Sequence, residues 1–127
     1  MITDIQKHVS YWLESGIEDM ETAELLVASR RIRHGLFFAH LAMEKIIKAH
    51  ICKHTKNIAP RIHNLLRLSA QSGINFSDEQ TKFLARFDRY QIEGRYPEFL
   101  PASVSQDNAS KEIEEVKEFF SWLISQL

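Results

Sequence analysis

The chain has 127 residues, of which 44% are hydrophobic and 26% are charged, and its 16 basic and 17 acidic side chains give a net charge of −1. This composition is typical of one globular domain and is too apolar for a disordered chain. Cys52 is the only cysteine, which excludes an intramolecular disulfide framework and favours a reducing compartment. No apolar stretch resembles a signal peptide or a membrane span. The sequence therefore predicts a single cytoplasmic domain over residues 1–127, without membrane association.

The first half of the chain has apolar side chains at steps of three and four, the spacing typical of helices. One such stripe predicts a helix that begins after Thr3 or Asp4 and extends to about Ser29. A second helix is predicted over residues 32–54, and Pro60 lies beyond its end, since proline lacks the amide donor that a helix needs. Two long helices joined by so short a connection must lie antiparallel.

Shorter helices are predicted in the second half of the chain. One covers residues 62–72 and stops at Gly73. The next begins after Ser77, which forms a capping-box pattern with Gln80, and breaks at Gly94. A proline-containing loop follows over residues 95–104, and a last helix completes the chain. The sequence thus predicts an all-α, up-down antiparallel helical bundle of about five helices, two long and three shorter.

The near-zero net charge conceals a strong segregation along the chain. Residues 1–28 carry one base and six acids, residues 29–67 carry nine bases and one acid, and residues 68–127 carry six bases and ten acids. A cationic stretch of this kind attracts phosphates if its side chains share a face in the folded protein. The alternative is that antiparallel packing of oppositely charged helices pairs these bases with the acids of the first segment, residues 1–28.

The apolar face of the second predicted helix is interrupted by Glu44. A carboxylate in such a position needs a partner, because burying it alone would cost several kcal/mol. His40 precedes it by four residues and Lys48 follows it by four, so both can reach it along the helix. We expect His40 and Glu44 to form a structural polar network, and a contact with a ligand is the alternative. His50 and His54 also have a four-residue spacing, but without further ligands no metal site is predicted.

The segment DRYQIEGRYPEF, residues 88–99, is the least generic part of the sequence. It contains two Arg-Tyr pairs, Arg89-Tyr90 and Arg95-Tyr96. Arginine offers a planar fork for phosphate, and tyrosine offers a flat face for a base. The chain has no glycine-rich phosphate loop, so side chains would have to hold any nucleotide. In the alternative interpretation, the tyrosines fill the core and the arginines cap helix carbonyls.

Three motifs in order along the chain resemble those of the HEPN domain, a small helical family with a nucleotide-binding role. FFAHLAMEKIIKA, residues 37–49, resembles the family's second-helix motif, which leads into Glu-Lys. IHNLLRL, residues 62–68, resembles its His-Asx-Leu third helix. DRYQIEGRYPE, residues 88–98, resembles its tyrosine-rich stretch of the Arg-Tyr-Pro type. Together the motifs cover most of the chain.

The resemblance implies a helical bundle with two long antiparallel helices, a homodimer, and a role with nucleotides or nucleic acid. It also implies a minimal nucleotidyltransferase as partner. The HEPN protein either binds the nucleotide substrate for this enzyme, or is a toxin that the enzyme restrains. Ribonucleases of the family have an arginine followed, after four to six residues, by a histidine that acts as acid or base. Arg95 matches that arginine, but no histidine follows it in YPEFLPAS. The chain therefore departs from the catalytic pattern.

We accordingly predict a non-catalytic, nucleotide-binding partner of a minimal nucleotidyltransferase in a toxin–antitoxin-like pair. Its predicted contacts with nucleotide or RNA are Arg95, Tyr96, Tyr90, Lys48, Lys53 and His63. No catalytic residue, cofactor or metal is predicted. One alternative is a ribonuclease toxin in which Arg95 holds the phosphate and His63 or His40 acts as acid or base. The other is a structural dimerisation module in which the Arg-Tyr-Pro segment only closes the bundle.

Overall fold

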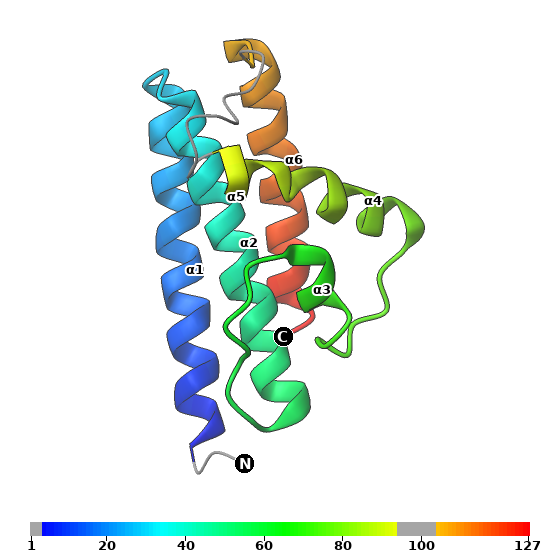
Figure 1. The fold of residues 1–127 in the computed structure, drawn as a ribbon. Coiled ribbons are helices and arrows are strands. Elements are labelled where there is room, and N and C mark those ends of the chain that lie inside the picture. Colours follow the sequence, from blue (N-terminus) through cyan, green and yellow to red (C-terminus); the bar gives the residue numbers. More distant parts are fainter. Residues whose placement is uncertain (1–3, 94–103) are drawn as a thin grey trace.

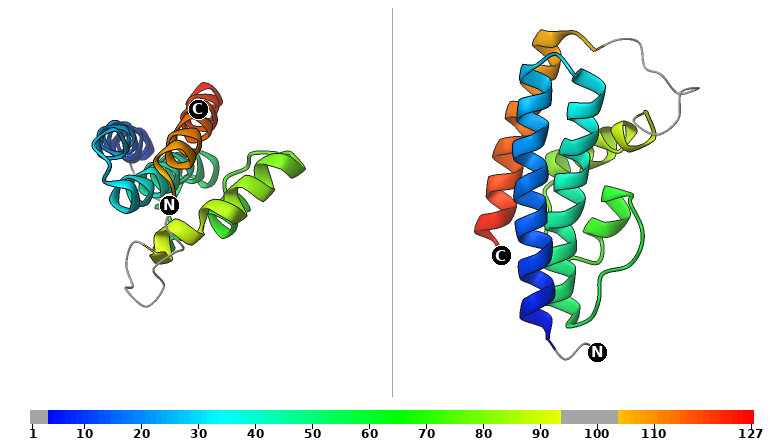
Figure 2. Two further views of the ribbon diagram at one scale, coloured as in Figure 1. Left: turned by 90° about the horizontal axis from the view of Figure 1, so that it is seen from above. Right: turned by 90° about the vertical axis from the view of Figure 1, so that its left-hand side faces the viewer.

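The computed structural model describes residues 4–93 and 104–127, and the long helices α1 (Ile5–Ala28), α2 (Ile32–Thr55) and α6 (Gln106–Ser125) form a bundle. Figures 1 and 2 show that α1 runs antiparallel to α2 and that α6 runs parallel to α2. Both α1 and α6 pack beside α2. Of the remaining helices, α3 (Leu65–Ser69) and α5 (Arg89–Glu93) pack on a further side of α2, and α4 (Asp78–Phe87) contacts α3 and α5. The all-α bundle predicted from the sequence is confirmed.

Helix α2 forms the centre of the hydrophobic core. Met43, Ile46 and Ile47 have no exposed surface, and buried residues occur on several sides of this helix. The reason is that α1, α6 and the α3–α5 region contact α2 from different directions. Gly35 permits the close approach of α1 near the connecting turn, because a Cβ atom there would lie 2.4 Å from a methyl group of Val27. Any polar side chain on the inner part of α2 must therefore find its partner inside the protein.

The short helices differ from the sequence prediction in their extent. The helix predicted over residues 62–72 is only the five-residue α3, which Asn64 caps by accepting a hydrogen bond from the Arg67 amide. The helix predicted from Ser77 begins with the expected capping box, but it is interrupted at Asp88 and resumes as α5. Gly94, the predicted break, lies outside the described residues. The last helix is also longer than expected, with 20 residues, so three long helices form the bundle.

Across residues 4–93 and 104–127, none of the helices combines the length and the apolar character that crossing a membrane requires.

Candidate functional site

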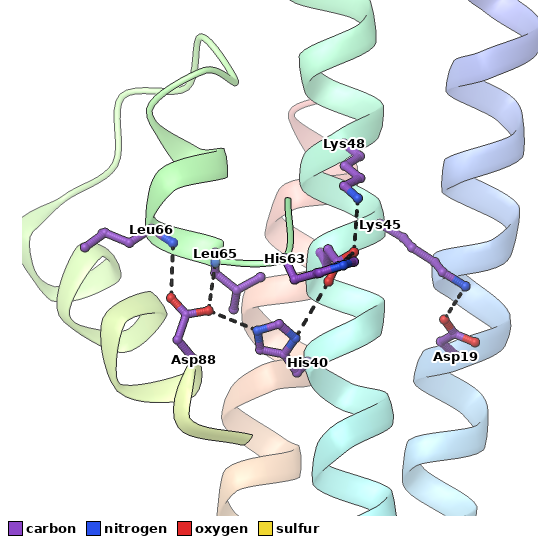
Figure 3. A network of polar contacts seen from close by, with 9 residues as sticks. Asp19, His40, Lys45, Lys48, His63, Leu65, Leu66 and Asp88 are labelled. Carbon is purple, nitrogen blue, oxygen red and sulfur yellow. Dashed lines mark hydrogen bonds and ion pairs between the residues drawn. The ribbon is translucent and has the colours of Figure 1, made fainter. Parts of the chain in front are cut away.

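Glu44, on α2, accepts two hydrogen bonds although it is only 4% exposed. Its Oε2 atom lies 3.1 Å from the Lys48 ammonium and 3.1 Å from Nδ1 of His63 (Figure 3). Lys48 is equally buried, and its ammonium also lies 5.2 Å from the centre of the Trp12 ring. A carboxylate oxygen only accepts, so Nδ1 of His63 carries the proton and donates it to this bond. The half-exposed His63 thus has its ring orientation fixed by a buried acid.

His40 joins α2 to the junction between α4 and α5. The side chain is fully buried, and its Nε2 atom donates to Oδ1 of Asp88 at 3.0 Å (Figure 3). The same carboxylate accepts hydrogen bonds from the first two backbone amides of α3, those of Leu65 at 2.7 Å and Leu66 at 3.3 Å. Asp88 therefore caps α3 from a distant part of the chain. Sequence reasoning missed it, because no local spacing connects residue 88 with residues 40 and 65.

The contact between His40 and Glu44 themselves is longer, at 4.0 Å from Nδ1 to Oε1. Within the described residues, neither of these two buried atoms has a hydrogen-bond partner. The hydrogen bonds of His40 and Glu44 therefore lead to different groups, His40 to Asp88 and Glu44 to Lys48 and His63. This places His63 and Lys48, both predicted as nucleotide contacts, on the Glu44 carboxylate.

The cationic stretch of residues 29–67 divides into two parts in the folded protein. In the middle of α2, Lys45 pairs with Asp19 of α1 at 2.7 Å and Lys48 pairs with Glu44, so these charges are neutralised as the pairing alternative expects. At the start of α2, Arg30, Arg31 and Arg33 are exposed and none of them forms an ion pair with any described residue. Beyond the other end of α2, Lys56, Arg61 and Arg67 are also exposed without an ion pair to a described residue, so the unneutralised charge lies at both ends of this helix.

A cleft of about 510 Å³ lies between the α4–α5 region and α6, and we call it the α5–α6 cleft. Arg86 is fixed in it by two ion pairs, to Glu112 at 2.8 Å and to Glu115 at 2.9 Å. Tyr90 is only 6% exposed and donates its hydroxyl proton to the second oxygen of Glu112 at 3.0 Å. The other residues that line the cleft are Arg89, Val104, Asn108 and Lys111.

Arg89 and Lys111 are exposed cations of the α5–α6 cleft in addition to the ion-paired Arg86. The Arg89 guanidinium lies 5.3 Å from the centre of the Tyr90 ring, and Lys111 reaches the cleft from α6. Sequence reasoning identified Tyr90 but missed Lys111 and the double ion pair of Arg86, because only the packing of α6 beside α4 brings these residues together.

Lys53, another predicted contact, lies at a different place, near the end of α6. Its ammonium donates to the backbone oxygen of Leu127, and it lines a cleft of about 520 Å³ together with His50 and His54. His50 donates from Nε2 to the Leu123 carbonyl at 2.7 Å, and burial lowers the pKa of its imidazole, which favours the neutral ring. Among the residues that the structure describes, no three metal-ligating side chains gather.

The four described residues predicted to contact a nucleotide therefore occupy three places in the fold. Lys48 and His63 share the Glu44 carboxylate, Lys53 lies near the end of α6, and Tyr90 lies in the α5–α6 cleft. Arg95 and Tyr96 lie outside the described residues. Of these places, the α5–α6 cleft is the one that combines an open cavity with several cations and an aromatic ring.

Comparisons with known proteins agree with this fold. The crystal structure of TT1696 from Thermus thermophilus is similar with a TM-score of 0.79 and 18% sequence identity, over 94% of this chain and 98% of that chain. At this identity, the likeness concerns the fold alone. No curated protein sequence matches the chain significantly. The model of the HEPN domain family matches residues 9–127. The chain therefore belongs to the HEPN domain family, which supports a general nucleotide-binding or RNA-related role.

Proposed function

We propose that this HEPN protein binds a nucleotide or an RNA phosphate in the α5–α6 cleft and acts as the non-catalytic partner of a minimal nucleotidyltransferase. The observation that carries the proposal is the convergence of Arg89 and Lys111, beside the ion-paired Arg86, on one cleft of about 510 Å³. Clefts of this size with a few convergent polar groups are typical of small-molecule sites. Arg95 and Tyr96 follow α5 directly in the sequence, and the proposal includes them as further contacts.

The cleft residues have separate roles in this proposal. Lys111 and Arg89 bind the phosphate, since both are exposed cations at the cleft. Arg86 is already neutralised by Glu112 and Glu115, so it fixes the wall between α4 and α6 rather than the ligand. Tyr90 packs edge-on against Phe87, with ring centres 4.7 Å apart, and supports the Arg89 guanidinium. Base stacking is assigned to Tyr96.

The non-catalytic part of the proposal is supported by the positions of the histidines. No histidine follows Arg95 at the spacing of the ribonuclease pattern, and none is among the described residues that line the α5–α6 cleft. His40 is fully buried and bonded to Asp88, so it cannot contact an RNA in this structure. His63 is the exposed candidate for acid–base chemistry, but its Nδ1 atom is bonded to Glu44.

A thermal-shift experiment tests nucleotide binding. ATP, GTP, CTP, UTP and a short RNA are added in turn to the parent protein and to the Lys111→Gln and Arg95→Ala variants. A ligand that binds only the folded protein stabilises it by about 2.7 kcal/mol at a hundred times its Kd. We expect one of these ligands to raise the Tm of the parent and to have a much smaller effect on both variants.

Lys117→Gln is the matched control, because Lys117 lies on the same helix but forms an ion pair with Glu24 of α1 at 3.4 Å. This variant should keep the full shift. An unchanged shift in Lys111→Gln, or no shift with any ligand, would contradict the proposed site. If the parent protein cleaves the RNA and the Arg95→Ala variant does not, the non-catalytic assignment is wrong and the ribonuclease alternative replaces it.

The predicted homodimer and the nucleotidyltransferase partner need their own measurement. Sedimentation equilibrium of the purified protein gives its oligomeric state, and addition of a minimal nucleotidyltransferase gives the heterocomplex. We expect a dimer and a further increase in mass on addition of the partner. A monomer that shows no mass increase would contradict both predictions.

A further inference from the structure

The turn between α1 and α2 has a high concentration of exposed positive charge. Arg30, Arg31, Arg33 and His34 are four of five consecutive residues, and we call them the basic tip. All four side chains are exposed, and the described part of the chain supplies no ion pair to any of them. Ile32, in their midst, instead packs against the hydrophobic core. The tip therefore presents charge without an apolar centre.

The backbone of the tip favours glycine at a position that arginine occupies. Arg30 has a φ angle of 64°, in the left-handed region that side chains disfavour. Its amide bonds to the Val27 carbonyl at 3.0 Å and the Arg31 amide bonds to the Leu26 carbonyl at 2.8 Å. This double hydrogen bond is the Schellman motif, whose left-handed residue is usually glycine. The chain therefore keeps arginine at a position where glycine would be more stable.

The positive charge of the residues at the start of α2 is unfavourable for the fold. Arg33 and His34 lie in the first turn of α2, which contains no acidic residue, and the positive end of a helix dipole repels cations. By contrast, the cations in the middle of α2, Lys45 and Lys48, are paired with acids. Local stability therefore does not account for the positive charge at the start of α2.

The neighbouring start of α6 leaves this charge uncompensated. Gln106 donates its side-chain amide to the Val27 carbonyl at 2.8 Å, so α6 begins beside the tip, as Figures 1 and 2 show. The acid in the first turn of α6 is Asp107, and within the described residues it forms no ion pair with an arginine of the tip. The three arginines therefore remain available to an external anion.

We propose that the basic tip binds the phosphate backbone of a nucleic acid, RNA or DNA, without reading its sequence. Arginine matches phosphate with a planar pair of donors, and neutralised phosphates release counterions, which drives the association. Protein interfaces are usually built around an apolar centre, whereas Ile32 faces the core and Leu25, near the end of α1, is a single exposed apolar side chain beside the tip. The proposal goes beyond the nucleotide site, since no residue of the tip is among the described residues that line the α5–α6 cleft.

Fluorescence anisotropy with labelled oligouridylate and oligothymidylate tests the proposal over a series of salt concentrations. The slope of the logarithm of the binding constant against the logarithm of the salt concentration reports the number of phosphate contacts. Each lost contact lowers the magnitude of this slope by about 0.7 for a single strand, which corresponds to roughly fivefold in affinity at 0.1 M salt. The variant with Arg30→Gly, Arg31→Gln and Arg33→Gln should therefore bind roughly a hundredfold more weakly, with a slope lower by about 2. Arg30→Gly alone should lose roughly fivefold and nevertheless raise the Tm by about 2–6 °C.

Lys56→Gly is a matched control. Lys56 also has a left-handed φ angle, of 56°, and is exposed, but it lies at the opposite end of α2. Its replacement should raise the Tm in the same way and leave the affinity unchanged. An equal loss of affinity in Lys56→Gly would refute the assignment to the tip.

Absence of binding by the parent protein at low salt would refute the proposal as a whole. If poly-glutamate binds as tightly as the oligonucleotides, and if this binding also depends on the three arginines, the proposal of a nucleic acid is wrong and the partner is an acidic protein. Binding of one oligonucleotide only would refute recognition through the phosphate backbone. The thermal shift that a nucleotide causes in the triple variant distinguishes this proposal from the nucleotide site in the α5–α6 cleft. The triple variant should keep the full shift whether or not the basic tip binds nucleic acid.

Discussion

Replacement of Asp88 by alanine should destabilise the protein much more than the loss of an ordinary helix cap. The carboxylate accepts hydrogen bonds from two backbone amides of α3, and this capping contributes about 1 kcal/mol. The change also leaves the Nε2 proton of the fully buried His40 without a partner, which costs about 1–3 kcal/mol. We therefore expect Asp88→Ala to lower the free energy of unfolding by about 2–4 kcal/mol.

Urea unfolding followed by circular dichroism measures this free energy. Asn64→Ala is the control, because Asn64 caps the same helix but is exposed and its side chain bonds to the Arg67 amide. It should cost about 1 kcal/mol. Adding His40→Leu to Asp88→Ala should restore part of the loss, since the buried imidazole donor that Asp88 satisfied is then removed. If Asp88→Ala costs no more than Asn64→Ala, the argument that His40 depends on Asp88 is wrong.

Three further changes test other parts of the structure. Glu44→Gln should cost about 3–5 kcal/mol in urea unfolding, because it leaves the buried Lys48 ammonium without an opposite charge. Gly73→Ala should cost at least about 1–2 kcal/mol, since Gly73 has a φ angle of 78° and a Cβ atom would lie 2.5 Å from the His54 ring. The folded state lowers the pKa of His50, so below its ordinary value of 6.5 the unfolded chain binds more protons and the stability falls as the pH falls. In His50→Gln, urea midpoints measured down to about pH 5 should lack this part of the decline.

Each of these changes has a control that can contradict its reasoning. Adding Lys48→Met to Glu44→Gln should recover most of the stability, and a failure to recover would show that the buried ammonium is not the cause. Adding His54→Ala to Gly73→Ala should recover only the cost of the steric contact, because the backbone angle remains. Equal pH dependence of the parent and His50→Gln would contradict the assignment to His50.

Much of the fold could be predicted because helices leave a local signature. The spacing of apolar residues predicted α1 and α2 to within a few residues, and the pattern of Ser77 and Gln80 predicted the start of α4. The three ordered motifs identified the family, which the match over residues 9–127 confirms. Each of these signals depends on residues that are close together in the sequence.

Two of the errors in the fold, the late start of α3 and the break after α4, involve the same residue, Asp88. Residues around α3 have helix-forming side chains, but the helix begins only at Leu65, where the carboxylate of Asp88, from a distant part of the chain, caps its first amides. The break between α4 and α5 occurs at the same residue, whose side chain is bonded to His40 and to α3. In both cases the helix boundary coincides with tertiary hydrogen bonds, which a local pattern does not contain.

The sequence by itself determined the helical class, the family and the concentration of positive charge in residues 29–67, because composition and short-range spacing are properties of the chain alone. Only the tertiary structure decided which charges remain exposed. Lys45 and Lys48 have acidic partners, whereas the arginines of the basic tip have none within the described residues. It also brought Lys111 to the cleft of Arg86 and Tyr90. Contacts between residues far apart in sequence depend on how the helices pack, and helix packing is set by the whole core rather than by any one segment.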